Sequence, residues 1–409
     1  MNLESIPHLP QNFKCLYIPR VVMVIGLCSC MLFLSPCSNA QARQNLSFSV
    51  PFTFDSKDGS NPQAALTRDN AGNLYGITVD GGSGAAGTLF RLSPSGKQIV
   101  LHNFAVGSDG SGPLAGVTLD GKGNIYGTTG AGGTGCNAGC GVVYKIDSAG
   151  HYSVLYTFTG GSDGASPEAN LILDAAGNIY GTTSSGGVTQ GGGGHGTAFE
   201  LEANGAFDLL YTFQGTPDAS NPTGNLIRDS AGNIYGTTTA GGFYDNGTVF
   251  KIDASGHETV LHSFDQSTTD GSSPFGGLSG DPATLLYGTT TGGGTNNDGT
   301  IFQIDASGNE SILHSFTGPD GSFPEAALLS VQGYLLGTTS GGGKDSCGTV
   351  FAFTPAQGIE VLHQFTCGSD GGYPSAPLLL DVAGSVYGST YGKYPCTGSL
   401  CRTIFKLSR

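Results

Sequence analysis

Short stretches in which apolar and polar residues alternate recur along the chain, and glycine-rich turns separate them. One set of four stretches spans 223–228, 233–238, 248–252 and 259–264. The turns at 229–232 and 253–256 both end in glycine, which adopts the positive φ of a tight turn without steric cost. Because alternation with a period of two is typical of β-strands, this set predicts four short antiparallel strands.

The same set occurs seven times. The tetrapeptide Tyr-Gly-Thr-Thr, or a close variant, marks each copy at intervals of 49 to 55 residues, starting at Tyr75, Tyr126, Tyr180, Tyr235, Tyr287, Leu336 and Tyr387. Gly-Thr-aliphatic-Phe, Leu-His/Tyr-x-Phe and Asp-Gly-x-x-Pro repeat with it. Four strands in about 50 residues are typical of one propeller blade, and blades bury both faces only in a ring. We therefore predict an all-β fold, a seven-bladed β-propeller.

The two ends of the chain are offset by one strand. Residues 48–54 match only the fourth strand of the repeat, whereas residues 404–407 match only the third. Pairing the N-terminal strand with the C-terminal blade would complete that blade and remove exposed strand edges. An open β-solenoid, the alternative, would not explain this offset. We expect residues 43–409 to form a single propeller domain closed in this way.

Residues 1–42 have the features of a secretory signal peptide. Lys14 and Arg20 precede an apolar run over 21–34, and the segment ends with Ala40-Gln41-Ala42. A short membrane anchor or a buried strand is the alternative. Lipid attachment at Cys37 is disfavoured by the preceding proline. We expect an exported protein, periplasmic or extracellular, and no membrane span after cleavage, because no later run reaches about 18 apolar residues.

Composition narrows the function classes. The chain has 70 glycines in 409 residues, no tryptophan, and a net charge of −15. Glycine inside a helix costs about 1 kcal/mol relative to alanine, so this composition argues against a helical protein. A negative chain repels phosphates, so we expect no nucleic-acid partner. We expect a monomer.

Six cysteines remain after residue 42, an even number that favours disulfides in an exported chain. Cys347 and Cys367 flank a predicted hairpin at facing positions, and the other pairs each close one glycine-rich loop. The predicted disulfides are therefore Cys136–Cys140, Cys347–Cys367 and Cys396–Cys401. Zinc binding by the two closely spaced pairs is the alternative, but neither pair has a nearby histidine.

Two motifs carry a resemblance to a known family. They are Gly177-Asn178-Ile179-Tyr180-Gly181-Thr182-Thr183 and Gly247-Thr248-Val249-Phe250-Lys251-Ile252-Asp253. The layout over 48–409 resembles the GloVer tandem repeat of exported bacterial proteins, and the Asp-x-x-Gly-Asn-Ile-Tyr turn is similar to that of NHL-type propellers. The resemblance implies a secreted β-propeller and supplies neither an activity nor catalytic residues.

The Asp-Gly-x-x-Pro signature places one aspartate in each copy. These residues are Asp58, Asp109, Asp163, Asp218, Asp270, Asp320 and Asp370. A ring of acceptors for a cation or for sugar hydroxyls is one interpretation. An aspartate that starts a turn accepts its own backbone N–H groups, which explains the spacing without a ligand. We expect the aspartates to be mostly structural, and the sequence contains no calcium-loop motif and no phosphate loop.

Long loops offer the candidate binding surface. With strands numbered outward from the axis, the loop between strands 2 and 3 (the 2–3 loop) and the loop to the next blade (the 4–1 loop) share one face. Aromatic, Asn, Asp and Lys residues that break the repeat there could bind a ligand, although ordinary packing at loop tips is the alternative. These candidates are Phe243, Tyr244, Asp245, Asn246, Asn296, Asn297, Asp298, Phe323, Tyr373, Tyr391, Lys393 and Tyr394.

Catalytic candidates are few. His102, His262, His314 and His363 share a repeat position with tyrosines, which indicates packing with a polar tip rather than metal binding. His195 is a loop histidine outside the repeat and could act as a base, but the sequence identifies no orienting partner. We therefore expect a non-catalytic module that binds carbohydrate or protein, without a cofactor. The alternative is a polysaccharide lyase or hydrolase with its site at the axial opening.

Overall fold

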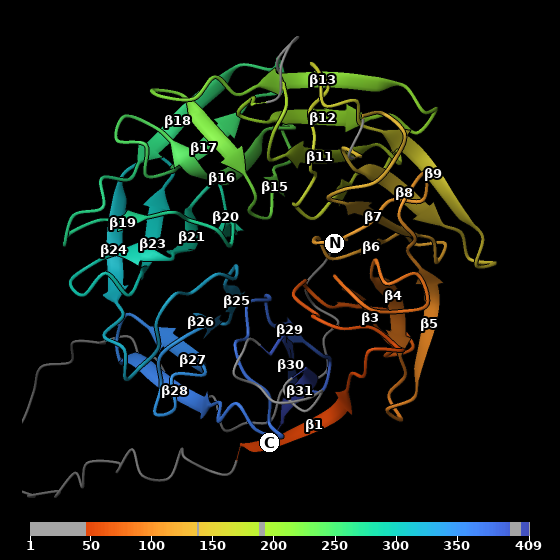
Figure 1. The fold of residues 1–409 in the computed structure, drawn as a ribbon. Coiled ribbons are helices and arrows are strands. Elements are labelled where there is room, and N and C mark those ends of the chain that lie inside the picture. The colour runs from red at the N-terminus through yellow and green to blue at the C-terminus, as the bar shows by residue number, and fades with distance from the viewer. Residues whose placement is uncertain (1–45, 137–138, 188–192, 393–401, 409) are drawn as a thin grey trace, which may run out of the picture.

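The chain forms seven four-stranded antiparallel sheets arranged around a central axis (Figure 1). The computed structural model describes residues 46–136, 139–187, 193–392 and 402–408. Blades 1 to 3 comprise β2 (Thr67–Arg68), β3 (Leu74–Thr78), β4 (Thr88–Leu92) and β5 (Gln98–Asn103); β6 (Thr118–Leu119), β7 (Ile125–Thr129), β8 (Val142–Ile146) and β9 (Tyr152–Thr157); and β10 (Ile172–Leu173), β11 (Ile179–Thr183), β12 (Thr197–Leu201) and β13 (Phe207–Thr212). This architecture confirms the predicted seven-bladed propeller.

The remaining blades repeat the same order outward from the axis. Blades 4 to 6 comprise β15 (Ile227–Arg228), β16 (Ile234–Gly241), β17 (Thr248–Ile252) and β18 (Glu258–Ser263); β20 (Ser279–Asp281), β21 (Leu285–Thr290), β23 (Thr300–Asp305) and β24 (Glu310–Ser315); and β25 (Leu329–Val331), β26 (Tyr334–Thr339), β27 (Thr349–Thr354) and β28 (Gly358–Gln364). Short loop strands β14 (Ala219–Pro222), β19 (Gly271–Ser272) and β22 (Gly292–Gly293) add to blades 4 and 5.

Blade 7 joins the two ends of the chain. It contains β29 (Leu379–Leu380), β30 (Val386–Thr390), β31 (Thr403–Ser408) and, as its outermost strand, β1 (Ser47–Thr53). The antiparallel register aligns Phe48 with Leu407 and Phe52 with Ile404. Figure 1 shows β1 alongside β31 at the rim. The predicted closure of the ring by the N-terminal strand is confirmed.

The innermost strands are shorter than the sequence pattern suggests. In blade 4 the predicted strand 223–228 is reduced to β15, only two residues long. The residues before it contact the next blade instead, as in the bridge between Asn225 and Gly277. Gly116 likewise donates its N–H to the Asn170 side chain of the following blade. Near the axis, contact between blades therefore replaces pairing within the blade.

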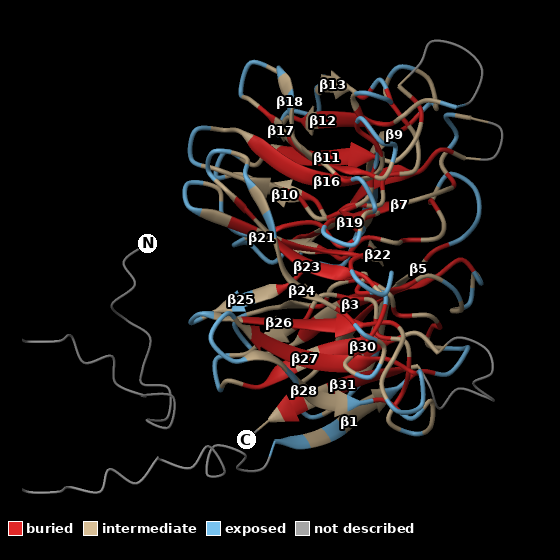
Figure 2. Cartoon of the chain, turned by 90° about the vertical axis from the view of Figure 1, so that its left-hand side faces the viewer, coloured by how far each residue is buried: buried red, intermediate tan, exposed pale blue. Residues whose placement is uncertain are grey.

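An aromatic pair crosses every interface between neighbouring blades. The final phenylalanine of each Leu-His/Tyr-x-Phe signature, or its N-terminal equivalent, meets the third-strand aromatic ring of the next blade, with centroids 5.0–5.3 Å apart. The pairs are Phe54–Phe90, Phe104–Tyr144, Phe158–Phe199, Phe213–Phe250, Phe264–Phe302, Phe316–Phe351 and Phe365–Phe405. All are edge-to-face contacts between buried rings, the geometry that aromatic quadrupoles favour. Figure 2 shows β16, β26 and β27 buried, whereas β1 and many loops are exposed to solvent.

The glycine of Tyr-Gly-Thr-Thr makes room for this packing. Gly236 on β16 lies opposite Phe250 on β17, and a Cβ added there would be 2.6 Å from the ring and 2.8 Å from Leu226. The close approach of a ring, expected from a glycine within a strand, is therefore present. The second threonine of the motif is also buried, since the Thr238 hydroxyl lies 2.7 Å from that of Thr248.

Two predicted disulfides are confirmed. Cys136–Cys140 closes a loop of blade 2, and Cys347–Cys367 links segments at the two ends of the β27–β28 hairpin. The third predicted pair, Cys396–Cys401, lies outside the described residues, as do the predicted signal peptide and Cys37. None of the described segments forms a helix that could span a membrane. These features are compatible with an exported protein.

Replacing Gly236 by alanine should destabilise the fold. The new methyl group would overlap Phe250 and Leu226, so we expect the free energy of unfolding to fall by about 1–3 kcal/mol, as in other overpacked cores. Gly121→Ala is the matched control, because nothing lies within 4 Å of a Cβ at that turn. Urea unfolding of both variants measures the difference, and an unchanged midpoint for Gly236→Ala would contradict this account.

Candidate functional site

The 4–1 and 2–3 loops lie side by side on one face of the ring. Isolated antiparallel bridges join them at the same position in successive blades: Ser60–Asp80, Ser111–Ala131, Ala165–Ser185 and Ser322–Gly341. β14 pairs with β16 and β19 with β22 in the same manner in blades 4 and 5. We refer to this face as the long-loop face.

The repeated aspartates anchor the 4–1 loops. Asp320, for example, accepts the backbone N–H of Thr317 at 2.9 Å and lies 2.8 Å from Nε2 of His314. Six of the seven aspartates pair with the histidine or tyrosine of the preceding fourth strand: His102–Asp109, Tyr156–Asp163, Tyr211–Asp218, His262–Asp270, His314–Asp320 and His363–Asp370. Asp58, the seventh, accepts the N–H of Asp55. The aspartates therefore stabilise the geometry of their own loops.

A left-handed residue precedes the proline of each 4–1 loop. The seven positions are Asn61, Gly112, Ser166, Asn221, Ser273, Phe323 and Tyr373, with φ between 52° and 60°. Glycine and asparagine adopt this conformation most readily, whereas a bulky residue there is an outlier held in place by its surroundings. Blades 6 and 7 thus carry aromatic side chains at a strained position where the other blades carry small polar residues or glycine.

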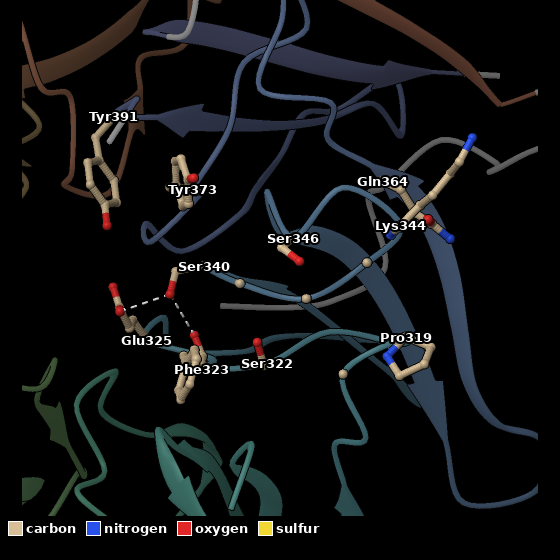
Figure 3. A pocket seen from close by; sticks show the side chains of 14 residues that line it. Pro319, Ser322, Phe323, Glu325, Ser340, Lys344, Ser346, Gln364, Tyr373 and Tyr391 are labelled. Atoms are coloured by element: carbon tan, nitrogen blue, oxygen red, sulfur yellow. Dashed lines mark hydrogen bonds between the residues drawn. The ribbon is translucent and has the colours of Figure 1, made fainter. Parts of the chain in front are cut away.

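Both strained aromatics line the same cleft, which has a volume of about 980 Å³ (Figure 3). The 4–1 loop before β25 contributes Pro319, Ser322, Phe323 and Glu325, and the 2–3 loop of blade 6 contributes Ser340, Lys344 and Ser346. Gln364 comes from the end of β28, and Tyr373 and Tyr391 come from the loops of blade 7. The cleft therefore lies on the long-loop face where blades 6 and 7 meet.

The walls of the cleft differ in chemistry. Tyr373 and Tyr391 form one wall, with ring centroids 6.1 Å apart, and Glu325, Ser340 and Phe323 lie opposite (Figure 3). Burial, helped by the Glu325 carboxylate and Tyr373, raises the pKa of Tyr391 to about 12, so its hydroxyl stays neutral and can donate. Ser340 Oγ donates to Glu325 Oε1 over 2.9 Å. An apolar ring face and several hydroxyl-binding groups are thus combined in one cavity.

Some predicted binding residues are brought together and others are not. Phe323, Tyr373 and Tyr391 line the cleft, whereas Lys393 and Tyr394 lie outside the described residues. Phe243 and Tyr244 are exposed on the 2–3 loop of blade 4, 72% and 54% respectively, and contact each other.

The remaining predicted residues hold loop geometry. Asp245 and Asn297 accept backbone N–H groups of their own loops, from Gly241 and Gly293. The carbonyls of Asn246 and Asp298 accept the N–H of Ser273 and Phe323, the left-handed residues of the next 4–1 loop. For the side chain of Asn296, no hydrogen bond to another described residue is found, and its position gives no indication of a ligand.

His195 lies apart from the carboxylates that a catalytic base would need. Its Nδ1 is 2.9 Å from the Ser220 hydroxyl, and no carboxylate contact is found for it in the described part of the chain. The arrangement links a 2–3 loop to the following 4–1 loop. In the described residues His195 is therefore not oriented by a carboxylate, as the general base of a lyase or hydrolase at the axial opening would be.

Sequence reasoning missed Glu325, Ser340, Lys344 and Gln364. Glu325 directly follows the proline that every copy of the repeat contains. In other copies this position holds Gln63, Leu114, Thr223, Phe275 and Ser375. Only Glu168 in blade 3 repeats it, and there too a serine hydroxyl, from Ser184, contacts the carboxylate. The sequence did contain a signal for Glu325, because this charged residue departs from the repeat two positions after Phe323, an aromatic residue that also departs from it.

Two further carboxyl groups are partly buried at the start of outer blade strands, where most other blades carry an aromatic or aliphatic residue. Glu258 opens β18 beside Asp218, and Glu310 opens β24 beside Asp270. Burial, together with the neighbouring aspartates, raises the pKa of Glu258 to about 8 and that of Glu310 to about 7. The equivalent residues of the other blades are Gln98, Tyr152, Phe207, Ile359 and Phe48. No sequence signature pointed to either glutamate.

Comparison with known proteins gives a family and a fold. The sequence model of the Gloeobacter/Verrucomicrobia repeat matches residues 40–193 and 135–348. Among curated proteins, no relative of the chain is found.

Solved structures similar to this chain have diverse roles. Virginiamycin B lyase from Staphylococcus aureus is 13% identical with a TM-score of 0.58, covering 89% of this chain and 100% of its own. A chain of the mitotic checkpoint complex is 13% identical with a TM-score of 0.54, covering 96% of this chain and 99% of its own. The extracellular domain of a protein described as a hybrid two-component system from B. thetaiotaomicron is 12% identical with a TM-score of 0.57, covering 89% of this chain and 40% of its own. At this identity the likeness shows the fold alone.

Replacing Phe323 by asparagine should stabilise the protein. Asparagine occupies the same left-handed position in two other blades, so the substitution relieves backbone strain of about 1 kcal/mol. Thermal unfolding should show a higher midpoint. The reverse change at an equivalent position, Asn221→Phe, is the control and should lower the midpoint. A lower midpoint for Phe323→Asn would show that the strain argument is wrong.

Glu258 should make stability depend on pH. Its folded-state pKa of about 8 exceeds the ordinary value of 4.5, so its stabilising contribution is complete below pH 4.5 and is lost as the pH rises through 8. Glu258→Gln cannot ionise, and we expect urea midpoints measured from pH 5 to 9 to decline less steeply than in the wild type. Substitution of the exposed Glu360 by glutamine is the control and should leave the decline unchanged. Equal slopes for wild type and Glu258→Gln would refute the shift.

Proposed function

The chain belongs to the Gloeobacter/Verrucomicrobia repeat family, and we propose that this member is an exported, non-catalytic module that binds carbohydrate in the cleft between blades 6 and 7. The predicted signal segment over 1–42 and the disulfides support export. The binding site consists of Phe323, Tyr373 and Tyr391 with the polar groups around them.

The strained aromatics carry this proposal. Phe323 and Tyr373 occupy the left-handed position that asparagine, serine and glycine occupy in the other five blades. Bulky side chains there cost stability, and such strain concentrates at ligand sites. Two consecutive blades carry the costly residue, and both residues line one cleft. Packing alone would be served as well by the small residues of the other blades.

The chemistry of the cleft favours a sugar. Aromatic rings pack against the C–H faces of pyranose rings, and the Glu325 carboxylate, the Tyr391 hydroxyl and the Gln364 amide suit sugar hydroxyls. The net charge of −15 disfavours an anionic ligand. Hydrolysis needs a pair of carboxyl groups across the scissile bond, whereas Glu325 is the single carboxylate among the described residues that line the cleft.

A glycan array with the mature protein tests the proposal. We expect binding to a neutral oligosaccharide, and Tyr373→Ala and Tyr391→Ala should each weaken it at least 10-fold in calorimetry, since loss of a stacking ring removes about 1.4 kcal/mol or more. The double variant Phe243→Ala/Tyr244→Ala is the control. It removes two exposed rings of blade 4 that do not line the cleft, and it should bind as the wild type does.

Three results would overturn the proposal. They are an array without any binding, affinities that do not respond to the cleft variants, and release of products from a polysaccharide. The last result would favour the lyase or hydrolase alternative. Capture of a defined protein that depends on Tyr373 would instead assign the cleft to a protein ligand.

A further inference from the structure

Three potential metal ligands from three segments converge between blades 4 and 5. They are His262 on β18, Asp270 in the following 4–1 loop, and Glu310 at the start of β24, and their ligand atoms lie within 4.8 Å of one another. His262 Nε2 is 3.2 Å from each carboxylate oxygen of Asp270. Donors arranged tetrahedrally around one zinc ion, at about 2.0–2.1 Å from the metal, are separated by about 3.3–3.4 Å. The His–Asp spacing is close to this separation, and a Glu310 carboxylate oxygen lies within 4.8 Å of the other two ligand atoms.

We propose that His262, Asp270 and Glu310 bind a divalent transition-metal ion at the boundary between blades 4 and 5. This site is independent of the carbohydrate cleft, which lies in blades 6 and 7. It also departs from our sequence-based expectation that the repeated histidines would serve only in packing.

The state of Glu310 supports a ligand at this position. Its Oε1 atom is fully buried and has no hydrogen-bond partner among the described residues. A buried carboxylate oxygen without a partner is costly, and a bound cation would compensate that cost directly. Asp265 adds a further negative charge nearby, since it acts electrostatically on Glu310. The site therefore has an excess of negative charge around one imidazole.

The other blade boundaries provide internal comparisons. At three of them an aromatic ring stacks on the histidine or tyrosine of the pair: Tyr152 on His102, Phe207 on Tyr156 and Phe48 on His363, with centroids 3.7–4.2 Å apart. At the boundary between blades 4 and 5, Glu310 occupies the position of that ring and offers a carboxylate, a metal-binding group, in its place. At the preceding boundary Glu258 stands beside Tyr211 and Asp218, where a phenol takes the place of the imidazole. Within the described chain, only the fourth boundary joins His, Asp and Glu.

The donor set indicates which metal would bind. Imidazole with carboxylates suits zinc and manganese, whereas calcium prefers an all-oxygen set. The side chains of His262 and Asp270 are 21% and 11% exposed, so both can be reached from solvent. Binding requires His262 Nε2 without its proton, so the Nε2–H bond to Asp270 would be exchanged for coordination by both groups.

Calorimetry with the tag-free mature protein, after treatment with EDTA and dialysis at pH 7.5, tests the site. We expect saturable binding of one Zn²⁺ ion, weaker binding of Mn²⁺, no binding of Ca²⁺, and a higher unfolding temperature with Zn²⁺. Glu310→Gln should weaken Zn²⁺ binding at least about 10-fold. Glu258→Gln, the same substitution one blade earlier, should bind as the wild type does.

Two further variants keep the test decisive. His262→Tyr recreates the blade 3 pair with a residue the fold already accepts, and it should lose Zn²⁺ binding even if Glu310→Gln fails to fold. Tyr211→His should create a second His–Asp–Glu set and raise the stoichiometry from one to two. Absence of saturable Zn²⁺ binding, or wild-type affinity in folded Glu310→Gln or His262→Tyr, would overturn the proposal.

Discussion

The edge-to-face aromatic pair at each blade interface determines the ring. Such a pair contributes about 0.5–1.5 kcal/mol beyond its buried area, and the same pair occurs at all seven interfaces. It requires a glycine in the second strand, because the third-strand ring lies directly over it, as Phe250 lies over Gly236. The interface that depends on the N-terminal strand, Phe54–Phe90, has the same geometry as the others. The closure is therefore one more copy of the interaction that builds the rest.

This regular interior fixes the loops and leaves their tips free to vary. Each 4–1 loop is held by its aspartate, which accepts backbone N–H groups and, in six of the seven loops, contacts the polar tip of the preceding strand, as Asp320 does with Thr317 and His314. The loop then presents its left-handed residue at the same place in every blade. Blade 4 carries Asn221 at this place and blade 6 carries Phe323, so the two surfaces differ although the four blade strands follow the same order. The chemistry of the long-loop face is thus set by which side chain occupies a fixed position.

The sequence predicted the periodic features of the fold, and it predicted only some of the features that depart from the repeat. The strands and the closure follow from the repeat because each copy corroborates the others, whereas the two disulfides were predicted from the even number of cysteines and from their positions on a hairpin and a loop. The inner strand at 223–228 was predicted too long, since its pattern records burial against the next blade as well as pairing. Phe323 and Tyr373 were found as breaks in the repeat. Glu310 was not, because its relation to His262 joins separate blades and the equivalent position holds aromatic, aliphatic and polar residues elsewhere.

The two buried glutamates give the last step of the argument. A scaffold selected for stability alone would cover each polar pair with a ring, as Phe48 covers His363 at 3.7 Å. Replacing that ring by a carboxylate removes stacking and buries an acid beside an aspartate, which raises the pKa of Glu258 and Glu310. Beside Tyr211 and Asp218 the acid meets a phenol and a second carboxyl group, so burial and repulsion favour its protonated form. Beside His262 the same acid meets an imidazole nitrogen, a second donor that a cation can share, so one substitution in the repeat has different chemical consequences in adjacent blades.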